Sequence, residues 1–437
     1  MRTRLAMFVA FLLAPTGPTF ADGPPSVPAT RPEMKRFLED SKRNQPRLPL
    51  PPLTAEEREK ASQGDWSVVN NGRMRKFYLP ADLAGAGFVR GPDPSMTLGH
   101  PMQTMIFWVV SRCNNCTYCM GHQESKLAAA GLSEDRIAAL DGDWSEFTAA
   151  ERAAFAFARK LTLAPHAVGP ADVEGLRRHY SDPEILEILV VAANFNAMNR
   201  WTGALKIPQE DHRVYLTPTP AKYREGASRV APLDPARPAS GPSCAAPSRR
   251  PPLESPAEVD AALAACRGRT PLLPLADDAR ARALLPADFP SGPAPEWARL
   301  LANFPKAGGA RIALRRAAEE KGTLDPRLRA EVAYTAARLD RAWYALGHAR
   351  RRLAALGYTP AQVEALDGPL AAFPPPGRAA LALARKLTVD PALVDDADVD
   401  ALHPHFPEKQ VAELIHHVTE AAFFDRVTEA TRLRLED

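Results

Sequence analysis

The chain has 437 residues, of which 45% are hydrophobic and 24% are charged, a balance ordinary for a globular protein with room for two cores. The formal net charge is only +3 and no Lys/Arg run resembles a nucleic-acid-binding arm, so we expect no nucleic-acid partner. The 44 prolines include two dense, polar tracts. Residues 22–53 are expected to form an extended tether, and residues 217–256 an interdomain linker.

Residues 1–21 have the pattern of a secretory signal peptide. Arg2 and Arg4 make a positive start, residues 5–14 are apolar, and Ala21 is the small residue before a cleavage point. The apolar run is too short to span a bilayer, which needs roughly 20 residues. We therefore expect an exported protein, periplasmic or extracellular, with no membrane span and in an oxidising compartment. An uncleaved anchor is the alternative.

After the tether, the patterns are those of helices. Thr54 begins a capping-box pattern, and Ser133 precedes an acidic first turn. Residues 148–163 have one apolar face, and residues 182–201 predict a long apolar helix. No stretch alternates convincingly as a strand would. We predict an all-α fold, with a first helical domain over residues 54–216.

An internal repeat without gaps spans the linker. When Arg112 is aligned with Arg338, about 29 of the 68 positions over residues 112–179 are identical to their counterparts. The sequence therefore predicts the same helical domain twice, with the second copy over residues 257–437. Such a pair could act as an internal dimer, and the chain could also form a homo-oligomer. We expect the two copies to contact each other along a seam formed by two apolar segments, residues 105–110 and 332–337.

The two copies differ in their cysteines. The first copy carries three, and the second has apolar residues at the same places: Cys113, Cys116 and Cys119 are matched by Leu339, Ala342 and Ala345. Only the first copy is therefore equipped for thiol chemistry.

The thiols lie beside a predicted helix start. Asn114 and Asn115 are expected to separate two helices and to cap the second one. Cys116 and Cys119 would then lie in its first turn, where unpaired N–H groups and the helix dipole favour a thiolate. With His122 another turn along, the set has the arrangement of a peroxidatic thiol, a resolving thiol and an acid–base imidazole.

This motif, Cys116-Thr-Tyr-Cys119 followed by His122 in an all-α domain, resembles the carboxymuconolactone decarboxylase / alkylhydroperoxidase D family. The resemblance covers about residues 98–210 well, with residues 194–201 similar to that family's closing helix. It covers about 324–437 as a degenerate copy without thiols.

The resemblance implies an activity and a role for each residue. Cys119 would attack a hydroperoxide, Cys116 would resolve the sulfenic acid, and His122 would relay protons. The expected activity is that of a thiol-dependent, peroxiredoxin-like antioxidant peroxidase or a disulfide oxidoreductase. Its partners would be a hydroperoxide or other small substrate and an external dithiol reductant, and no cofactor is expected. The family's relay glutamate and usual histidine positions hold Thr104 and Gln123, so proton relay is expected to be slower, to use Glu124 or water, or to be absent.

Several alternatives stand beside this interpretation. His348 keeps the Gly-His pair in the thiol-free copy, so His122 could be a packing residue. Cys113 extends the motif toward a metal site, but four ligands spread around one helix would not converge on one ion. Cys116 and Cys119 could form a structural disulfide, and the linker's Cys244 could pair with Cys266. The alternative functions are a carboxymuconolactone-decarboxylase-like lyase, which does not use the cysteine pair, and a non-catalytic envelope scaffold or binding protein.

Overall fold

The computed structural model describes residues 28, 30–63, 68–85, 93–211, 215, 218 and 252–436. Every regular element within these ranges is a helix, which confirms the all-α fold class. Among the same residues, no helix combines the length and the apolar content that crossing a membrane would require. The expected signal peptide, residues 1–21, lies outside the described residues.

The first half of the chain contains ten α-helices in the described ranges: α1 (Arg31–Asp40), α2 (Ala55–Ser62), α3 (Asn70–Tyr78), α4 (Ala81–Ala84), α5 (His100–Cys113), α6 (Thr117–Ala129), α7 (Glu134–Ala139), α8 (Ala149–Leu163), α9 (Pro170–Arg177) and α10 (Asp182–Ala204). The second half contains ten more: α11 (Pro256–Arg267), α12 (Asp278–Arg282), α13 (Glu296–Leu301), α14 (Pro305–Glu320), α15 (Pro326–Asp340), α16 (Trp343–Ala355), α17 (Pro360–Ala365), α18 (Pro375–Val389), α19 (Asp396–Asp400) and α20 (Glu408–Ala430). Short 3₁₀ turns include η2 (Pro165–Ala167) and η5 (Pro391–Leu393).

The helix boundaries repeat with the offset seen in the sequence, the one that aligns Arg112 with Arg338. The helix starts differ by this same offset in each of these pairs: α5 and α15, α6 and α16, α7 and α17, α8 and α18, α9 and α19, α10 and α20. The last pair matches at both ends, since Asp182–Ala204 becomes Glu408–Ala430. The same local signals therefore start and stop the helices of both halves.

The helix starts expected from capping patterns are confirmed. Thr54 and Thr148 each accept a hydrogen bond from the third helical residue, whose glutamate accepts one from the cap's backbone N–H. Ser133 caps α7 through Arg136 N–H. These side chains satisfy N–H groups that the helices themselves leave unpaired.

The extended tether expected over residues 22–53 is wrong for its described part. Residues 31–40 form α1, which Thr30 starts with a capping box. Met34 and Leu38 are fully buried in the core, and Arg31 forms a buried ion pair with Glu124 of α6. The Thr30-x-x-Glu33 signal and the apolar spacing were present, but the surrounding prolines suggested extended chain.

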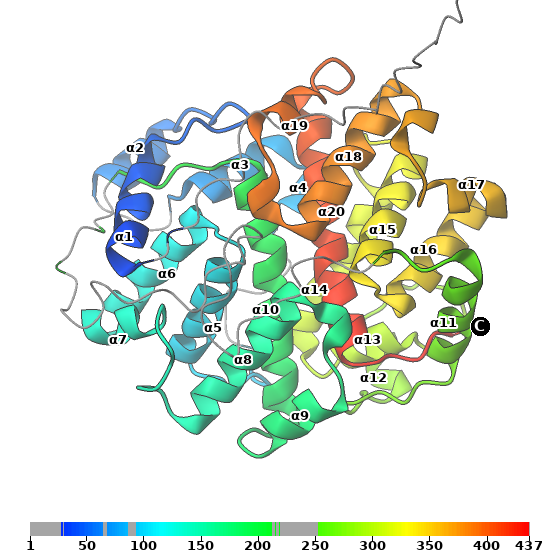
Figure 1. Cartoon of the computed structure of the whole chain (residues 1–437), viewed down its shortest axis with the longest axis horizontal. Helices are drawn as coiled ribbons and strands as arrows, with labels where there is room; N and C mark the ends of the chain where they lie inside the picture. The colour runs from blue at the N-terminus through cyan, green and yellow to red at the C-terminus, as the bar shows by residue number, and fades with distance from the viewer. Residues whose placement is uncertain are drawn as a thin grey trace, which may run out of the picture.

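The two halves meet along α10 and α20, which lie side by side through the middle of the molecule, with first-half helices to one side and second-half helices to the other (Figure 1). The contacts are reciprocal. Arg200 of α10 donates to the carbonyl of Thr388 at 3.0 Å, and Arg426 of α20 donates to the carbonyl of Thr162 at 3.2 Å. Because each contact is the other shifted by the repeat offset, the halves pack as an internal pseudo-dimer.

The seam is therefore not the one expected from residues 105–110 and 332–337. Those segments lie in α5 and α15, and each packs against helices of its own half. Their apolar character reflects burial inside a half. Periodicity shows that a helix is buried but not which neighbour buries it.

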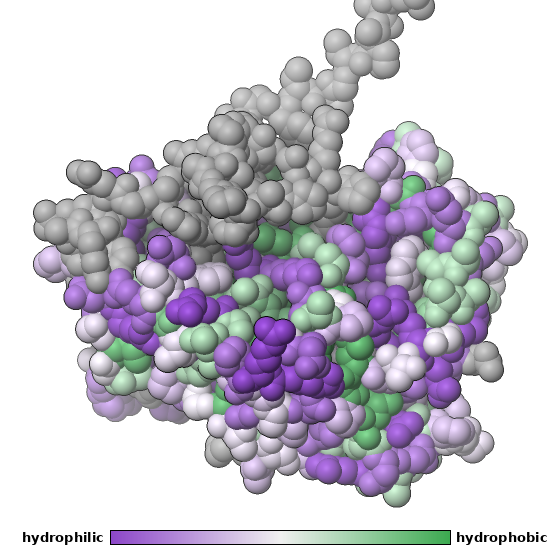
Figure 2. All heavy atoms as spheres, turned by 60° about the horizontal axis from the view of Figure 1, so that its bottom comes forward, coloured by the Kyte–Doolittle hydropathy of each residue, from purple (hydrophilic) through white to green (hydrophobic). Residues whose placement is uncertain are grey.

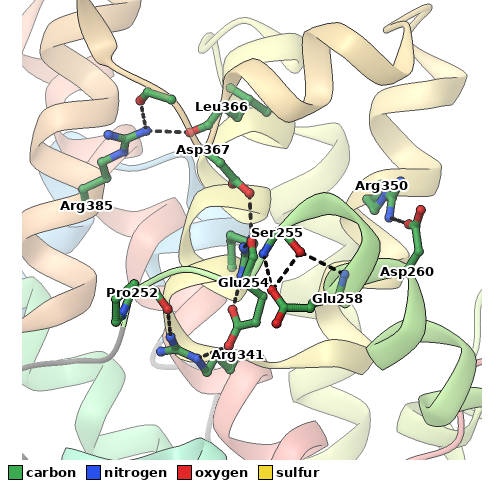
Figure 3. Close-up of polar contacts among 12 residues, drawn as sticks. Pro252, Glu254, Ser255, Glu258, Asp260, Arg341, Arg350, Leu366, Asp367 and Arg385 are labelled. Carbon is green, nitrogen blue, oxygen red and sulfur yellow. Dashed lines mark hydrogen bonds and ion pairs between the residues drawn. The ribbon is translucent and has the colours of Figure 1, made fainter.

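The start of the second half is fixed by ion pairs at the end of the expected linker. Glu254 accepts from Arg341 at 2.5 Å, and the carbonyl of Pro252 accepts from the same guanidinium at 2.9 Å (Figure 3). Ser255 then caps α11, which begins at Pro256. Most of the linker, residues 219–251, lies outside the described residues.

Polar side chains cover most of the face drawn in Figure 2, where apolar side chains gather only in small separate areas. Among the described residues, the large hydrophobic side chains that are exposed are Phe77, Leu253 and Val389. They lie on different elements, so they do not indicate a single apolar docking surface.

A buried histidine of α20 gives a pH-dependent stability. Burial, and then the charges of Arg329 and Arg352, lower the pKa of His417 to about 3 from 6.5. Because the folded state holds this pKa below its unfolded value, the stabilisation is complete above pH 6.5 and is lost as pH falls toward 3.

We expect His417→Asn to reveal this dependence. The free energy of unfolding of the wild type, relative to the variant, should fall by about 1.4 kcal/mol per pH unit below 6.5. Urea unfolding at several pH values in this window measures the difference. His403→Asn, at an exposed position of the same half, is the control. A difference that does not change with pH would contradict the assignment.

Candidate functional site

The site is built on the turn between α5 and α6. Asn114 is the C-cap of α5, and Asn115 adopts the left-handed conformation (φ 49°), which asparagine tolerates better than most residues. The chain then enters α6 with Cys116 at the N-cap position. The predicted break at the asparagine pair is confirmed, but the cap position is one residue further on, and Cys119 is the third residue of the helix.

Both thiols face one hydroxyl of α10. The Oγ1 atom of Thr202 lies 3.1 Å from the Sγ of Cys116 and 3.1 Å from the Sγ of Cys119. A hydroxyl has one proton and two lone pairs, and the Thr202 proton is donated to the Met198 carbonyl at 3.0 Å, so Thr202 donates to one sulfur and accepts from the other only when that bond is exchanged. Thr202 is thus placed to pass a proton between the two sulfurs.

The two thiols differ in acidity. Burial opposes ionisation of Cys116, but hydrogen bonds from the Cys119 thiol, Thr202, the Cys119 backbone N–H and Asn199 outweigh it and lower the pKa of Cys116. Burial, together with the neighbouring Cys116, raises the pKa of Cys119 well above its usual value. The position at the start of α6, where the Cys116 sulfur accepts from the backbone N–H of Cys119, therefore makes Cys116 the more acidic thiol of the pair.

Cys116 lies at an open space. A cavity of about 240 Å³ is lined by Cys116 and Thr202, together with the charged residues Asp40, Arg47 and Lys206. Among the described residues that line this cavity, Cys119 is not included. The thiols are 4% and 2% exposed, respectively, so a small solute would reach Cys116 through the cavity before it could meet Cys119.

A cluster of asparagines holds the turn against α10. The Asn114 side chain donates to the side-chain oxygens of Asn196 (3.1 Å) and Asn199 (2.9 Å). Asn196, Asn199 and Thr202 recur every third residue of α10 and so lie near one face. Sequence analysis missed these positioning residues. The signal was available as three polar positions, at helical spacing, in a segment expected to be buried.

His122 faces a carboxylate that sequence analysis also missed. Its Nε2 lies 2.8 Å from Glu210, in the loop after α10, and its ring packs on Tyr118. Tyr118 donates to the same glutamate at 2.8 Å, and Glu210 accepts from the backbone N–H of Asn70 at 2.9 Å. The cluster therefore joins three parts of the first half: α3, α6 and the chain after α10.

The thiol-free half contains the same cluster. Tyr344 and His348 contact Glu436 at 2.8 and 3.2 Å, and Glu436 accepts from the backbone N–H of Glu296 at 2.7 Å. Each of these residues follows its counterpart by the repeat offset. Since the cluster is retained without any cysteine nearby, it favours a structural role for His122.

Gly121, the glycine of the Gly-His pair that both repeats share, lies where there is no room for a side chain. A side chain at this position would overlap Gln209 and Tyr215, and at Gly347 it would overlap Leu435. Gln209 donates to the carbonyls of Thr117 and Tyr118 at 2.8 Å each. In both halves, glycine lets the returning chain pack directly on the cysteine-bearing helix or its counterpart.

Glu124, expected as a substitute for the missing relay glutamate, has other partners. It is engaged by the Arg31 guanidinium and accepts from Trp108 at 3.2 Å. Thr104, which stands at the position of that glutamate, donates to the carbonyl of His100 within α5. Neither contacts a thiol in these hydrogen bonds, so Thr202 is the proton-carrying group nearest to the sulfurs.

We expect His122→Gln to lower stability more than it lowers thiol oxidation. The change removes the imidazole contacts to Glu210 and Tyr118, which should cost about 1–3 kcal/mol of unfolding free energy. His348→Gln, in the cysteine-free half, is the matched control and should cost a similar amount. Urea unfolding and peroxide consumption are measured on both variants. A large loss of activity in His122→Gln alone would restore the relay role.

The remaining described cysteines are not in disulfides. Cys113 is the last residue of α5 and is buried. Cys266 is also a free thiol, and its Sγ donates to the carbonyl of Leu433 at 3.6 Å. The expected partner, Cys244, lies outside the described residues. Within the described ranges, no group of three or more His, Cys, Asp or Glu side chains is arranged to hold a metal ion.

The family resemblance rests on this turn, on the helix that follows it and on α10. The described residues bring Cys116 and Cys119 together at Thr202, and they pair His122 with Glu210 instead. The family itself stays a prediction. Neither the comparison with known protein families nor that with curated proteins finds a match for this sequence.

Proposed function

We propose that the protein is an exported thiol-dependent peroxidase or disulfide oxidoreductase that uses Cys116 and Cys119 as its redox pair. The observation that carries the proposal is the shared hydroxyl of Thr202, 3.1 Å from both sulfurs, beside a cavity that reaches Cys116. Two thiols that contact one proton carrier, one of them acidified, have what reversible disulfide chemistry needs.

In the proposed reaction the Cys116 thiolate attacks the terminal oxygen of a hydroperoxide. The O–O bond breaks, Cys116 becomes a sulfenic acid, and the alkoxide takes the proton of Cys119 through Thr202 and leaves as an alcohol. The Cys119 thiolate then attacks the Cys116 sulfur, and hydroxide leaves and is protonated by solvent to water. An external dithiol reduces the disulfide and is itself oxidised.

This order reverses the roles implied by the family resemblance, in which Cys119 attacks. The acidity of Cys116 and its place at the cavity support the reversed order. Arg47 and Lys206 both pair with the carboxylate of Asp396, and Asp40 also lines the cavity. The two cations would give local hydrogen-bond donors for a polar hydroperoxide or reductant, without a net positive charge at the cavity.

The duplicated architecture belongs to the same proposal. The chain would consist of two alkylhydroperoxidase-D-like domains joined by the Pro-rich linker, with the thiols in the first. The repeated helix boundaries and the reciprocal contacts of Arg200 and Arg426 support this arrangement.

Intact-mass measurement tests the redox function directly. After treatment with one equivalent of peroxide, we expect the protein to lose the mass of two hydrogen atoms, and a dithiol should restore it. Peptide mapping should place the change on Cys116 and Cys119. A protein that keeps both free thiols under peroxide would support the non-catalytic scaffold instead.

A further inference from the structure

The second half contains a cavity at the place where the first half carries Cys119. It measures about 240 Å³ and lies among α14, α15, α16 and α20. Ala345, the counterpart of Cys119, and His348 line it. The thiol-free half is therefore not merely a support for the first, because it has an open space of its own.

The space is open because two large residues of the first half are small in the second. Phe107 and Phe195 stack on each other in the first half, with ring centroids 3.3 Å apart and planes within 3°. Their counterparts in the repeat are Ala333 and Ala421, and both line the cavity. Because alanine is much smaller than phenylalanine, the volume that the two rings fill in the first half is left open in the second.

The second half also lines the cavity with charge. Four arginines contribute to its wall: Arg311, Arg315, Arg329 and Arg352. Gln103 is the first-half counterpart of Arg329, and Val191 is that of His417. The positions of Gln103 and Val191 in the first half are thus held by an arginine and a histidine in the second.

The acids in the cavity do not cancel this charge. Arg311 pairs with Glu420 at 2.8 Å, and Glu319 lies 3.4 Å from Arg315 and 3.5 Å from Arg352. The third acid is Asp425, and burial and the nearby Asp340 raise its pKa well above the usual value, which opposes its ionisation. Four arginines therefore face two glutamates and one carboxyl group that ionises less readily.

Some polar atoms in the wall have no hydrogen-bond partner among the described residues. They are the Nε2 of His417, 8% exposed, the Oδ2 of Asp425, 1% exposed, and the Nε of Arg329. Buried polar atoms are rarely left unpaired without a ligand or water to meet them. These atoms are placed to form hydrogen bonds with a polar molecule bound in the cavity.

The cavity has a route to solvent. A larger space, of about 570 Å³, shares Arg315, Glu319 and His348 with it. That space is lined by exposed residues such as Asp288 and Arg351. A small molecule could therefore enter between α14 and α16.

We propose that this cavity of the second half binds a small organic carboxylate, with its charged group at the arginines and its apolar body against the alanines and Phe424. Arginine matches a carboxylate with parallel N–H donors. Arg315 is stacked on Phe424 with its guanidinium carbon 3.5 Å from the ring centroid, which orients its fork. The apolar floor of Ala333, Ala345 and Ala421 distinguishes such a ligand from a bare inorganic anion.

Benzoate is a suitable probe, with benzyl alcohol as its uncharged analogue and inorganic phosphate as the bare anion. By calorimetry on the full chain, we expect benzoate to bind at millimolar or lower concentration and the other two to bind at least about tenfold more weakly. Equal binding of benzyl alcohol would overturn the role of the arginines. Equal binding of phosphate would overturn the apolar half of the site.

Two variants place the binding in this cavity. Arg315→Gln should weaken benzoate binding about tenfold, whereas Arg350→Gln, which removes an arginine that pairs with Asp260 outside the cavity, should not. Ala421→Phe restores the residue type of the first half and should abolish binding by filling the space. Circular dichroism confirms that each variant is folded. Undiminished binding in either cavity variant would refute the proposal, and the result does not depend on the thiols.

Discussion

Cys116→Ser should lower peroxide consumption by about a thousandfold or more, because it removes the proposed nucleophile rather than a group that assists it. Cys119→Ser should behave differently. Its Cys116 thiolate can still be oxidised once, so we expect a single turnover that stops at a sulfenic acid, seen as a gain of one oxygen atom. A hydroxyl at residue 119 cannot form the disulfide that completes the cycle.

The difference between Cys116→Ser and Cys119→Ser, in rate and in oxidation product, shows which cysteine attacks the peroxide. Stopped-flow peroxide consumption gives the rate, and intact mass with a sulfenic-acid trap identifies the oxidised residue. Cys113→Ser, a buried thiol at the end of α5, is the control and should keep full activity. If Cys119 is the residue that carries the oxygen, the order of attack is the one carried over from the family. If both serine variants consume peroxide as fast as the wild type, the thiols are not the catalyst.

Arg426→Met should destabilise the protein by about 3–5 kcal/mol, the cost typical of breaking a buried ion pair. Arg426 and Asp340 are both fully buried and lie 3.0 Å apart, and the same guanidinium donates across the seam to Thr162. Removal of the guanidinium leaves the Asp340 charge without this partner where water does not reach. Urea unfolding measures the loss.

The first half supplies the matched control. Arg200 occupies the equivalent position and donates to the backbone and side-chain oxygens of Asn196 and to the carbonyl of Thr388. The counterpart of Asp340 is the neutral Asn114, so Arg200→Met should cost only about 1–3 kcal/mol. Adding Asp340→Asn to Arg426→Met should recover part of the loss. Equal costs at the two arginines, with no recovery, would show that charge is not the cause.

Much of the fold could be predicted from the sequence, because its signals are local. Capping residues such as Thr54 and Thr148 start helices wherever they occur, and the break at Asn114 and Asn115 follows from side-chain chemistry over a few residues. The helices of the repeat could be anticipated for the same reason, since similar segments form similar helices. The helix α1 was missed because neighbouring prolines outweighed a correct capping signal.

The site was predicted in part. The sequence placed Cys116 and Cys119 one turn apart, but it could not show Thr202 between them, because that residue comes from α10, a helix distant along the chain. For the same reason it could not pair His122 with Glu210, which follows that same helix. Spacing along one helix indicates which side chains share a face, but it does not indicate which residues pack against that face.

The sequence by itself determined the helical fold class, the repeat with its constant offset and the restriction of the thiol motif to the first half. Only the tertiary structure decided that α10 and α20 form the seam, that Cys116 is the more acidic and more accessible thiol, and that the second half has an arginine-lined cavity. The reason is physical. Helix formation depends on neighbours along the chain, whereas burial, pKa and empty space depend on residues that meet only after the chain has folded.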